Sequence, residues 1–252
     1  MKIQNTRKPV KRAVLQAMLL TDGSVVAECN YVSFANTSMV LINQFCSLIE
    51  DMYGYKIGKL QKGKSAKQQV FIAQFKSKEI CQDLLSDIKS YRTAPLKDEN
   101  YPEINLPKMW STCKTNEIAI ILRTIFDTDG GCSLRVAWRD ERKCFEIERT
   151  LFIACQHPML KIQYKELLNK LGVKCSISKD KITITNKGNF ELFRKLINFS
   201  DGVLIGYDSK HWQGIEKKEL LDAIIQSYNI SRGSIQKFEK KQIYSLIRPP
   251  SR

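Results

Sequence analysis

Two nine-residue stretches decide the fold of this chain: LQAMLLTDG at residues 15–23 and LRTIFDTDG at residues 122–130. Each closes an apolar segment with helical periodicity, so we predict a helix through each stretch, stopped by a C-cap glycine at Gly23 or Gly130. Small residues stand at the third and seventh positions of both stretches, which places them on one face of each helix. This stripe of small side chains predicts that the two helices pack closely side by side.

Both predicted helices end in an aspartate, Asp22 or Asp129, where the helix dipole already supplies negative charge and a cation is preferred. If the helices pack together, the two carboxylates come close, and their repulsion reaches several kcal/mol in a partly desolvated site. A divalent cation removes this conflict, because carboxylates and exposed helix carbonyls are the hard oxygen ligands that Mg²⁺ accepts. One Asp-Gly alone is a common turn after a helix, but a matching pair in two repeats favours a metal site.

The order of predicted elements is the same around both stretches. Each half has an amphipathic helix, two strands, a second helix, a hairpin and a third helix, which predicts an α+β fold of two αββαββα repeats. The predicted hairpins join residues 55–59 to 70–75 and residues 173–178 to 181–185. Alternation in residues 174–178 and 181–185 predicts sheets with one apolar face and one polar, basic face, which leaves the second face free for a ligand.

Proline-marked and turn-rich residues separate the halves. We predict a first repeat at residues 1–94, a linker at 95–112, a second repeat at 113–200 and a helical, basic extension at 201–252. We assign no chemistry to the extension from its sequence.

Composition narrows the classes of protein that fit. The chain has 252 residues, with 41 Lys and Arg against 26 Asp and Glu, a formal charge of +15. Its apolar content excludes a disordered protein, and its apolar runs are too short to span a membrane. We therefore expect a soluble intracellular protein that is not secreted, in the cytoplasm of a prokaryote or archaeon or in an organelle matrix. Eight dispersed cysteines without a C-x-x-C pair and only two histidines disfavour a zinc site and a histidine-based nucleophile.

The two stretches resemble the paired signature helices of the LAGLIDADG homing endonuclease family, in its monomeric two-repeat form. Signature positions one, three and seven to nine fit in both copies, whereas position six is Leu20 in the first and Asp127 in the second. The resemblance implies saddle-shaped antiparallel sheets with helices on the outer face. It also implies a site-specific endonuclease that places its sheets in successive major grooves of a long, partly pseudo-palindromic DNA target. Both strands would be cut across the minor groove, leaving short 3′ overhangs.

The resemblance also implies roles for single residues. Asp22 and Asp129 would bind Mg²⁺ or Mn²⁺, with Ca²⁺ as a substitute that does not support cleavage, and the carbonyls of Thr21 and Thr128 would complete the coordination. A polar residue near the end of the second strand would order water, and a lysine before the third helix would support it. The residues that match the water-ordering position are Asn36 in the first half and Gln156 in the second. The lysine position is matched by Lys187 in the second half and by Lys76 or Lys78 in the first.

A basic surface follows from the predicted strands, and its Lys, Arg and Gln side chains suit phosphates and base edges. Trp138 fits either the core or the groove. The candidates for DNA contact are Lys56, Lys59, Gln61, Lys62, Lys64, Lys67 and Gln69 in the first half, and Arg135, Trp138, Arg139, Arg142, Lys143, Lys174, Lys179 and Lys181 in the second.

We expect double-stranded DNA as the partner, with no membrane and no protein partner required. Two other functions stay open on the same scaffold. One is an RNA-binding cofactor that assists intron splicing, and the other is a DNA-binding protein without catalysis. The presence of both aspartates favours the nuclease.

Overall fold

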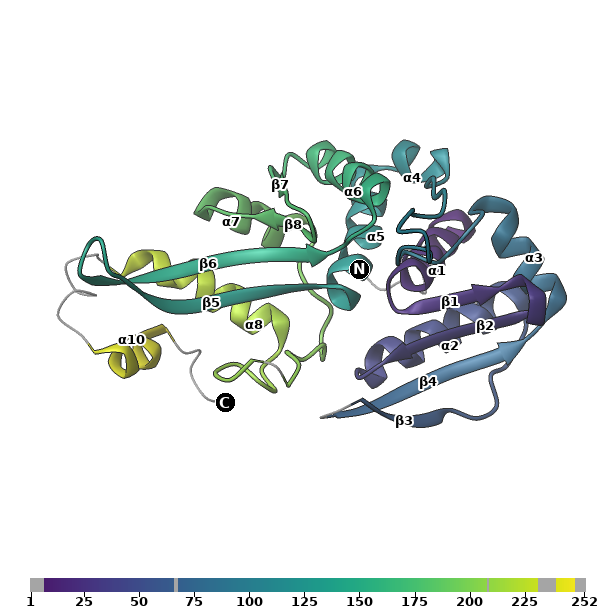
Figure 1. The fold of residues 1–252 in the computed structure, drawn as a ribbon, viewed down its shortest axis with the longest axis horizontal. Helices are drawn as coiled ribbons and strands as arrows, with labels where there is room; N and C mark the ends of the chain where they lie inside the picture. Colours follow the sequence, from purple (N-terminus) through teal and green to yellow (C-terminus); the bar gives the residue numbers. More distant parts are fainter. Residues whose placement is uncertain (1–6, 66–67, 208, 231–238, 248–252) are drawn as a thin grey trace.

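The computed structural model describes residues 7–65, 68–207, 209–230 and 239–247. Two four-stranded antiparallel sheets, with strand orders β1-β2-β4-β3 and β5-β6-β8-β7, lie side by side in Figure 1, and the predicted order αββαββα is confirmed in each half. The first half contains α1 (Lys8–Thr21), β1 (Gly23–Val26), η2 (Ala27–Cys29), β2 (Tyr31–Asn36), α2 (Met39–Tyr53), β3 (Gln61–Ser65), β4 (Gln68–Lys76) and α3 (Lys78–Asp87).

The second half follows a stretch, residues 88–107, that forms neither helix nor strand. It contains α4 (Lys108–Thr112), α5 (Thr115–Thr128), β5 (Gly130–Arg139), β6 (Cys144–Ala154), α6 (Pro158–Lys170), β7 (Ser176–Ile177), β8 (Lys181–Ile184) and α7 (Lys187–Leu196). The chain continues into α8 (Lys217–Gln226), η3 (Ser227–Asn229) and α10 (Lys240–Ile247). No helix within the described ranges combines the length and apolarity needed to cross a membrane.

Helices α1 and α5 pack against each other between the two sheets, as the small-residue stripe predicted. Side chains of α1 are buried around the whole helix, including Gln16, because α5, α2 and the first sheet surround it. The Gln16 amide is satisfied in this core: its Nε2 donates to Asp87 (2.7 Å) and its Oε1 accepts from Trp110 Nε1 (3.0 Å). The pair of helices is therefore the rigid centre on which both halves are built.

The prediction of C-cap glycines is wrong. Asp22 and Asp129 are the C-caps, while Gly23 and Gly130 begin β1 and β5 without left-handed backbone. Each glycine is required for another reason: a Cβ on Gly23 would lie 2.5 Å from Leu19 Cα, and one on Gly130 would lie 2.6 Å from Phe126 Cα. The strand thus leaves the helix end at a distance that only glycine permits.

Each sheet has one face against helices and one face without helical cover, which we call the open face. In β8 the alternation is as predicted, with Ile182 and Ile184 buried. The same prediction for residues 174–178 is wrong at Ile177, which is 39% exposed, because β7 is only a two-residue strand at the edge of the sheet.

The first-half hairpin also differs from its prediction. The strand that pairs with β4 is the polar run Gln61–Ser65, and residues 54–60 form no strand. Tyr55 instead packs its ring 4.7 Å from Phe75, so this apolar run covers the end of β4 and the polar residues form the edge.

Residues after α7 cover the outer edge of the second sheet, at strand β5. Trp212 Nε1 donates to Leu134 O (2.7 Å), and the Tyr244 hydroxyl accepts from Val136 N (3.2 Å). These bonds occupy backbone groups of the edge strand β5. Helix α8 runs beside β5 in Figure 1 and packs against it.

Candidate functional site

Asp22 and Asp129 lie at equivalent places in the two halves, each at the C-terminal end of a central helix. Their amides cap the helices by donating to Met18 O (3.1 Å) and Ile125 O (3.0 Å). Their carbonyls accept from the second strand of the half, Asp22 O from Ala35 N (3.0 Å) and Asp129 O from Ala154 N (2.9 Å). The end of the helix and the end of the strand therefore hold the backbone of each aspartate from two sides. Each aspartate stands at the end of its helix, as the sequence predicted.

The two carboxylates influence each other. Burial, together with the nearby charge of Asp22, raises the pKa of Asp129 to about 7. Burial also raises the pKa of Asp22, although the hydrogen bond from Asn36 and the charge of Lys217 oppose this rise. Two neighbouring buried carboxylates repel each other when both are ionised, and a bound cation would relieve this repulsion.

Asp127, two residues before Asp129, has a structural role. Its Oδ1 accepts from Ser200 N (3.1 Å), and burial raises its pKa to about 6. Leu20 stands at the corresponding place in the first half, so the two half-sites differ here.

Of the two residues predicted to order water, Asn36 is at the site: its Nδ2 donates to Asp22 Oδ2 (2.6 Å). Gln156 is not its counterpart. Gly23 pairs with Phe34 and Gly130 with Ile153, so the residue equivalent to Asn36 is Cys155, and Gln156 corresponds to Thr37. Burial raises the pKa of the Cys155 thiol to about 11, and Gln156 itself is exposed in the loop after β6.

The predicted supporting lysines lie away from the aspartates. Strands β2 and β6 end at the site, and their antiparallel neighbours β4 and β8 therefore start there and lead away. Lys76 pairs with Tyr31, four residues from Ala35, or about 13 Å along the strand. Lys78 follows Lys76 at the start of α3. Lys187 begins α7, beyond the end of β8 that is far from the site, and its Nζ lies 3.9 Å from Glu191 Oε1.

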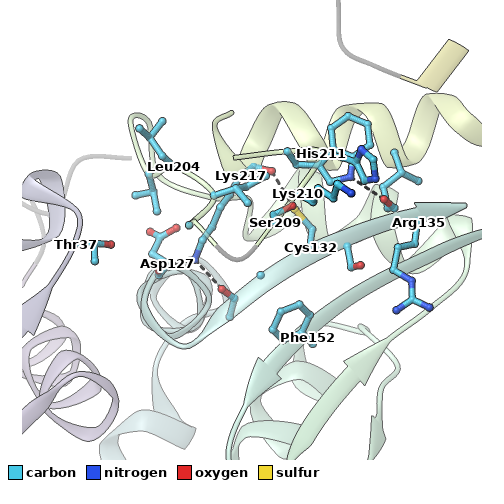
Figure 2. A pocket seen from close by; sticks show the side chains of 18 of the residues that line it. Thr37, Asp127, Cys132, Arg135, Phe152, Leu204, Ser209, Lys210, His211 and Lys217 are labelled. Carbon is cyan, nitrogen blue, oxygen red and sulfur yellow. Dashed lines mark hydrogen bonds between the residues drawn. The ribbon is translucent and has the colours of Figure 1, made fainter. Parts of the chain in front are cut away.

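A lysine that sequence reasoning missed supports the site instead. Lys217, the first residue of α8, donates from Nζ to the carbonyls of Phe126 (3.1 Å), Asp127 (2.7 Å) and Gly130 (2.7 Å). Burial lowers its pKa, while the nearby aspartates Asp127, Asp22 and Asp129 oppose this shift. Figure 2 shows its side chain reaching the end of α5. No local signal identifies it, because a lysine at the start of an amphipathic helix is ordinary.

A cavity of about 900 Å³ opens beside this helix end, between the first half, β5 and the residues after α7. In Figure 2, Thr37 lies across from Asp127 and Leu204, and Ser209 to His211 form another part of the wall. The cavity thus reaches the end of α5 at Asp127 and Thr128, and β5 and the residues after α7 form its other walls.

The residues at the helix ends fit a hard divalent cation by their chemistry, with two carboxylates beside main-chain oxygens. The Thr21 and Thr128 hydroxyls donate to carbonyls of their own helices, at 2.9 Å to Ala17 O and to Thr124 O, so only their carbonyls fit the predicted role. Within the described ranges, no group of three or more His, Cys, Asp or Glu side chains is arranged for a metal.

The predicted DNA contacts divide between the two faces of the sheets. Gln61, Arg135, Arg139 and Lys181 belong to the open face by register. Lys62 and Gln69 share the register of Phe71 and the buried Phe75, and Trp138 that of Leu134 and Val136, which places these three on the helix side.

The other candidates lie outside the long strands or beyond what the structure describes. Exposed loops or turns carry Lys56, Lys59, Arg142, Lys143, Lys174 and Lys179. Lys64 pairs with Gln69 in β3, and Lys67 lies outside the described residues.

Comparison with solved structures agrees with this architecture. The homing endonuclease I-WcaI bound to its DNA recognition sequence matches with a TM-score of 0.50 and 16% identity, over 81% of this chain and 90% of that chain. Full-length DUF199/WhiA from Thermatoga maritima matches with a TM-score of 0.52 and 10% identity, over 96% of this chain and 66% of that chain. The chain thus has the two-repeat α+β fold of LAGLIDADG proteins. The sequence matches no family model and no curated protein.

Proposed function

We propose that this protein is a site-specific, divalent-metal-dependent DNA endonuclease that cuts both strands and leaves short 3′ overhangs. One observation carries the proposal: two aspartates meet at the C-terminal ends of paired central helices, and the charge of one raises the pKa of the other. The fold alone does not decide the chemistry, because I-WcaI and DUF199/WhiA share it. The aspartate pair in a chain of charge +15 favours hydrolysis of a polyanion.

The residues of the site have separate tasks in this proposal. Asp22 and Asp129 hold Mg²⁺ or Mn²⁺ together with the carbonyls of Thr21 and Thr128, and Ca²⁺ permits binding without cleavage. When bound, the metal supplies charge stabilisation at the phosphoryl oxygens and a water of lowered pKa. Asn36 orients the Asp22 carboxylate through its 2.6 Å hydrogen bond. Lys217 fixes the main-chain carbonyls on either side of Asp129 and so holds the second aspartate in place.

DNA binding is assigned to the open faces and to the lysines around β3. A monomer with two unlike halves suits a long, partly pseudo-palindromic duplex target. No histidine base is needed, because in-line displacement depends chiefly on positioning and charge stabilisation.

The test is incubation of the purified protein with a library of randomised and host-locus duplexes in Mg²⁺, followed by sequencing of the cut ends. The proposal expects one recurrent sequence with staggered ends and short 3′ overhangs. Absence of cutting in Mg²⁺ and in Mn²⁺ across the library, by protein that binds duplex DNA, would contradict it.

A DNA-binding protein without cleavage is the second candidate. It is favoured by Cys155, a thiol at the place where the first half has the Asn36 amide. A thiol is a weaker hydrogen-bonding group than an amide, so the second half-site orders water less well. The same library experiment separates the two functions.

A further inference from the structure

The charges of the two DNA-facing hairpins differ sharply. Residues 56–76, which include β3 and β4, contain six lysines and no acidic residue. Residues 135–148, which include the outer part of β5 and β6, contain four basic and four acidic residues and so carry no net charge. The long hairpin of the second half therefore does not share the excess charge of the chain, although it supplies all three arginines expected to contact DNA.

The acidic residues of the long hairpin lie on its open face among the arginines. Glu148 pairs in register with Arg135, and Glu146 pairs with Ala137 on the same face. Arg135 Nη2 lies 3.1 Å from Glu148 Oε2, and Arg139 contacts both acids, at 3.1 Å to Glu146 Oε2 and 2.6 Å to Glu148 Oε1. Arg142, from the turn, forms a further ion pair with Glu146. Three arginines and two glutamates thus form one network.

The glutamates lie deeper in this network than the arginines. Glu146 and Glu148 are 32% and 30% exposed, whereas Arg135 and Arg142 are 67% and 65% exposed. The hydrogen bond and charge of Arg139, with those of Arg142, lower the pKa of Glu146, so this acid is charged at neutral pH. The arginine heads therefore face solvent while the acids hold them from below, an arrangement that fixes planar donors toward a ligand.

We propose that Glu146 and Glu148 are specificity-determining residues, which position Arg135 and Arg139 for base edges and cancel the charge that would attract any duplex. This inference rests on the proposed DNA binding. The lysines of residues 56–76 supply sequence-independent attraction, and the long hairpin contributes when the base edges match its arginines. An arginine that is held and neutralised by a glutamate gains little from contact with a phosphate alone. A guanine edge, in contrast, can accept hydrogen bonds from two donors of the guanidinium group in the orientation that the glutamates impose.

The test compares the wild type with the Glu146→Gln/Glu148→Gln double variant. The control is Glu141→Gln/Asp140→Asn, which removes the same charge from the turn of this hairpin. Fluorescence anisotropy measures binding to a random-sequence duplex and to a duplex selected by the wild type, in Ca²⁺ and from low to high salt. Circular dichroism and thermal unfolding verify that all three proteins are folded.

The double variant is expected to bind random duplex about tenfold more tightly at low salt, with a log K against log salt slope steeper by about 1 to 2. Its preference for the selected duplex should fall, and the control should change both quantities less. If the double variant matches the control in salt slope and in preference, the inference fails while DNA binding stands. If the folded wild type binds no duplex in this assay, both this inference and the proposed function fail. Neither outcome depends on cleavage.

Discussion

The carboxylates of Asp22 and Asp129 come from residues 107 positions apart in the chain, and the charge of Asp22 raises the pKa of Asp129. They influence each other because α1 and α5 pack against each other and each helix ends at one of the two aspartates. Each aspartate carbonyl is bonded to the second strand of its own half. The two acids therefore cannot separate to relieve their repulsion without breaking the helix-to-strand junctions, and this constraint underlies the first two predictions.

Asp22→Asn and Asp129→Asn should each abolish double-strand cleavage while DNA binding in Ca²⁺ persists. The amide keeps the shape of the side chain but is a poor ligand for a hard cation. Gel assays of supercoiled plasmid carrying the selected target measure cleavage, and anisotropy measures binding. Asp98→Asn, in an exposed stretch between the halves, is the control and should cut normally. Double-strand cutting by either site variant would refute the assignment of metal ligands.

The metal-free protein should lose stability as the pH rises from about 4 to about 7. The pKa of Asp129 in the folded protein is about 7, above its unfolded value near 4, so the folded state holds the proton more tightly. The free energy of unfolding is therefore highest below pH 4 for this group and falls through pH 7. Urea unfolding in EDTA should show this decline, and Asp129→Asn should reduce it. Mg²⁺ should restore stability at pH 7 by binding the folded state. An equal decline in Asp129→Asn and wild type would contradict the prediction.

Gly23→Ala and Gly130→Ala should each destabilise the protein by about 1–3 kcal/mol. The added methyl group meets the backbone of Leu19 or Phe126, which cannot move without shifting a central helix. Gly58→Ala is the matched control, because no atom lies within 4 Å of the position of its Cβ. Chemical denaturation measures all three. Equal stability of the Gly58 and Gly130 variants would show that the junction tolerates a side chain.

Lys217→Met should destabilise the protein by about 2–4 kcal/mol, because it leaves three carbonyls at the end of α5 without their shared buried donor. It should also weaken the stabilisation by Mg²⁺, since the turn that carries Asp129 loses its support. Lys218→Met removes the same charge from a surface ion pair and should cost less than about 1 kcal/mol. Urea titrations with and without Mg²⁺ measure both effects. If Lys217→Met lowers the free energy of unfolding no more than Lys218→Met does, the supporting role assigned to Lys217 is wrong.

Binding to duplex DNA should weaken steeply with salt, with a log–log slope on the order of −9 if about ten phosphates are neutralised. Lys56→Gln/Lys59→Gln should reduce the magnitude of that slope by about 2, because these exposed lysines lie in the acid-free segment of the first half. Lys89→Gln/Lys97→Gln, outside both sheets, is the control. Anisotropy at several salt concentrations gives the slopes, and equal slopes for the two double variants would show that this segment does not bind phosphate.

The sequence was enough to predict the elements whose signals are local. Periodicity identified the helices through Asp22 and Asp129, and repetition of the same order gave the two αββαββα halves, because helical and strand patterns repeat within a few residues. The small-residue stripes predicted the contact between α1 and α5, and with it the meeting of the two acids. The strand at Gln61–Ser65 was missed because its residues are polar and its pairing is made by the backbone.

What the sequence by itself determined is the αββαββα order and the pairing of the two aspartate-ended helices. Only the tertiary structure decided which residues support the aspartates and how the arginines are held. Antiparallel pairing places Lys76 and Lys187 away from the site. Strand register makes Cys155, rather than Gln156, the second-half equivalent of Asn36, and α8 brings in Lys217 from 88 residues after Asp129. These outcomes depend on strand direction, register and contacts between distant segments, and no pattern along the chain encodes a distance between residues that far apart.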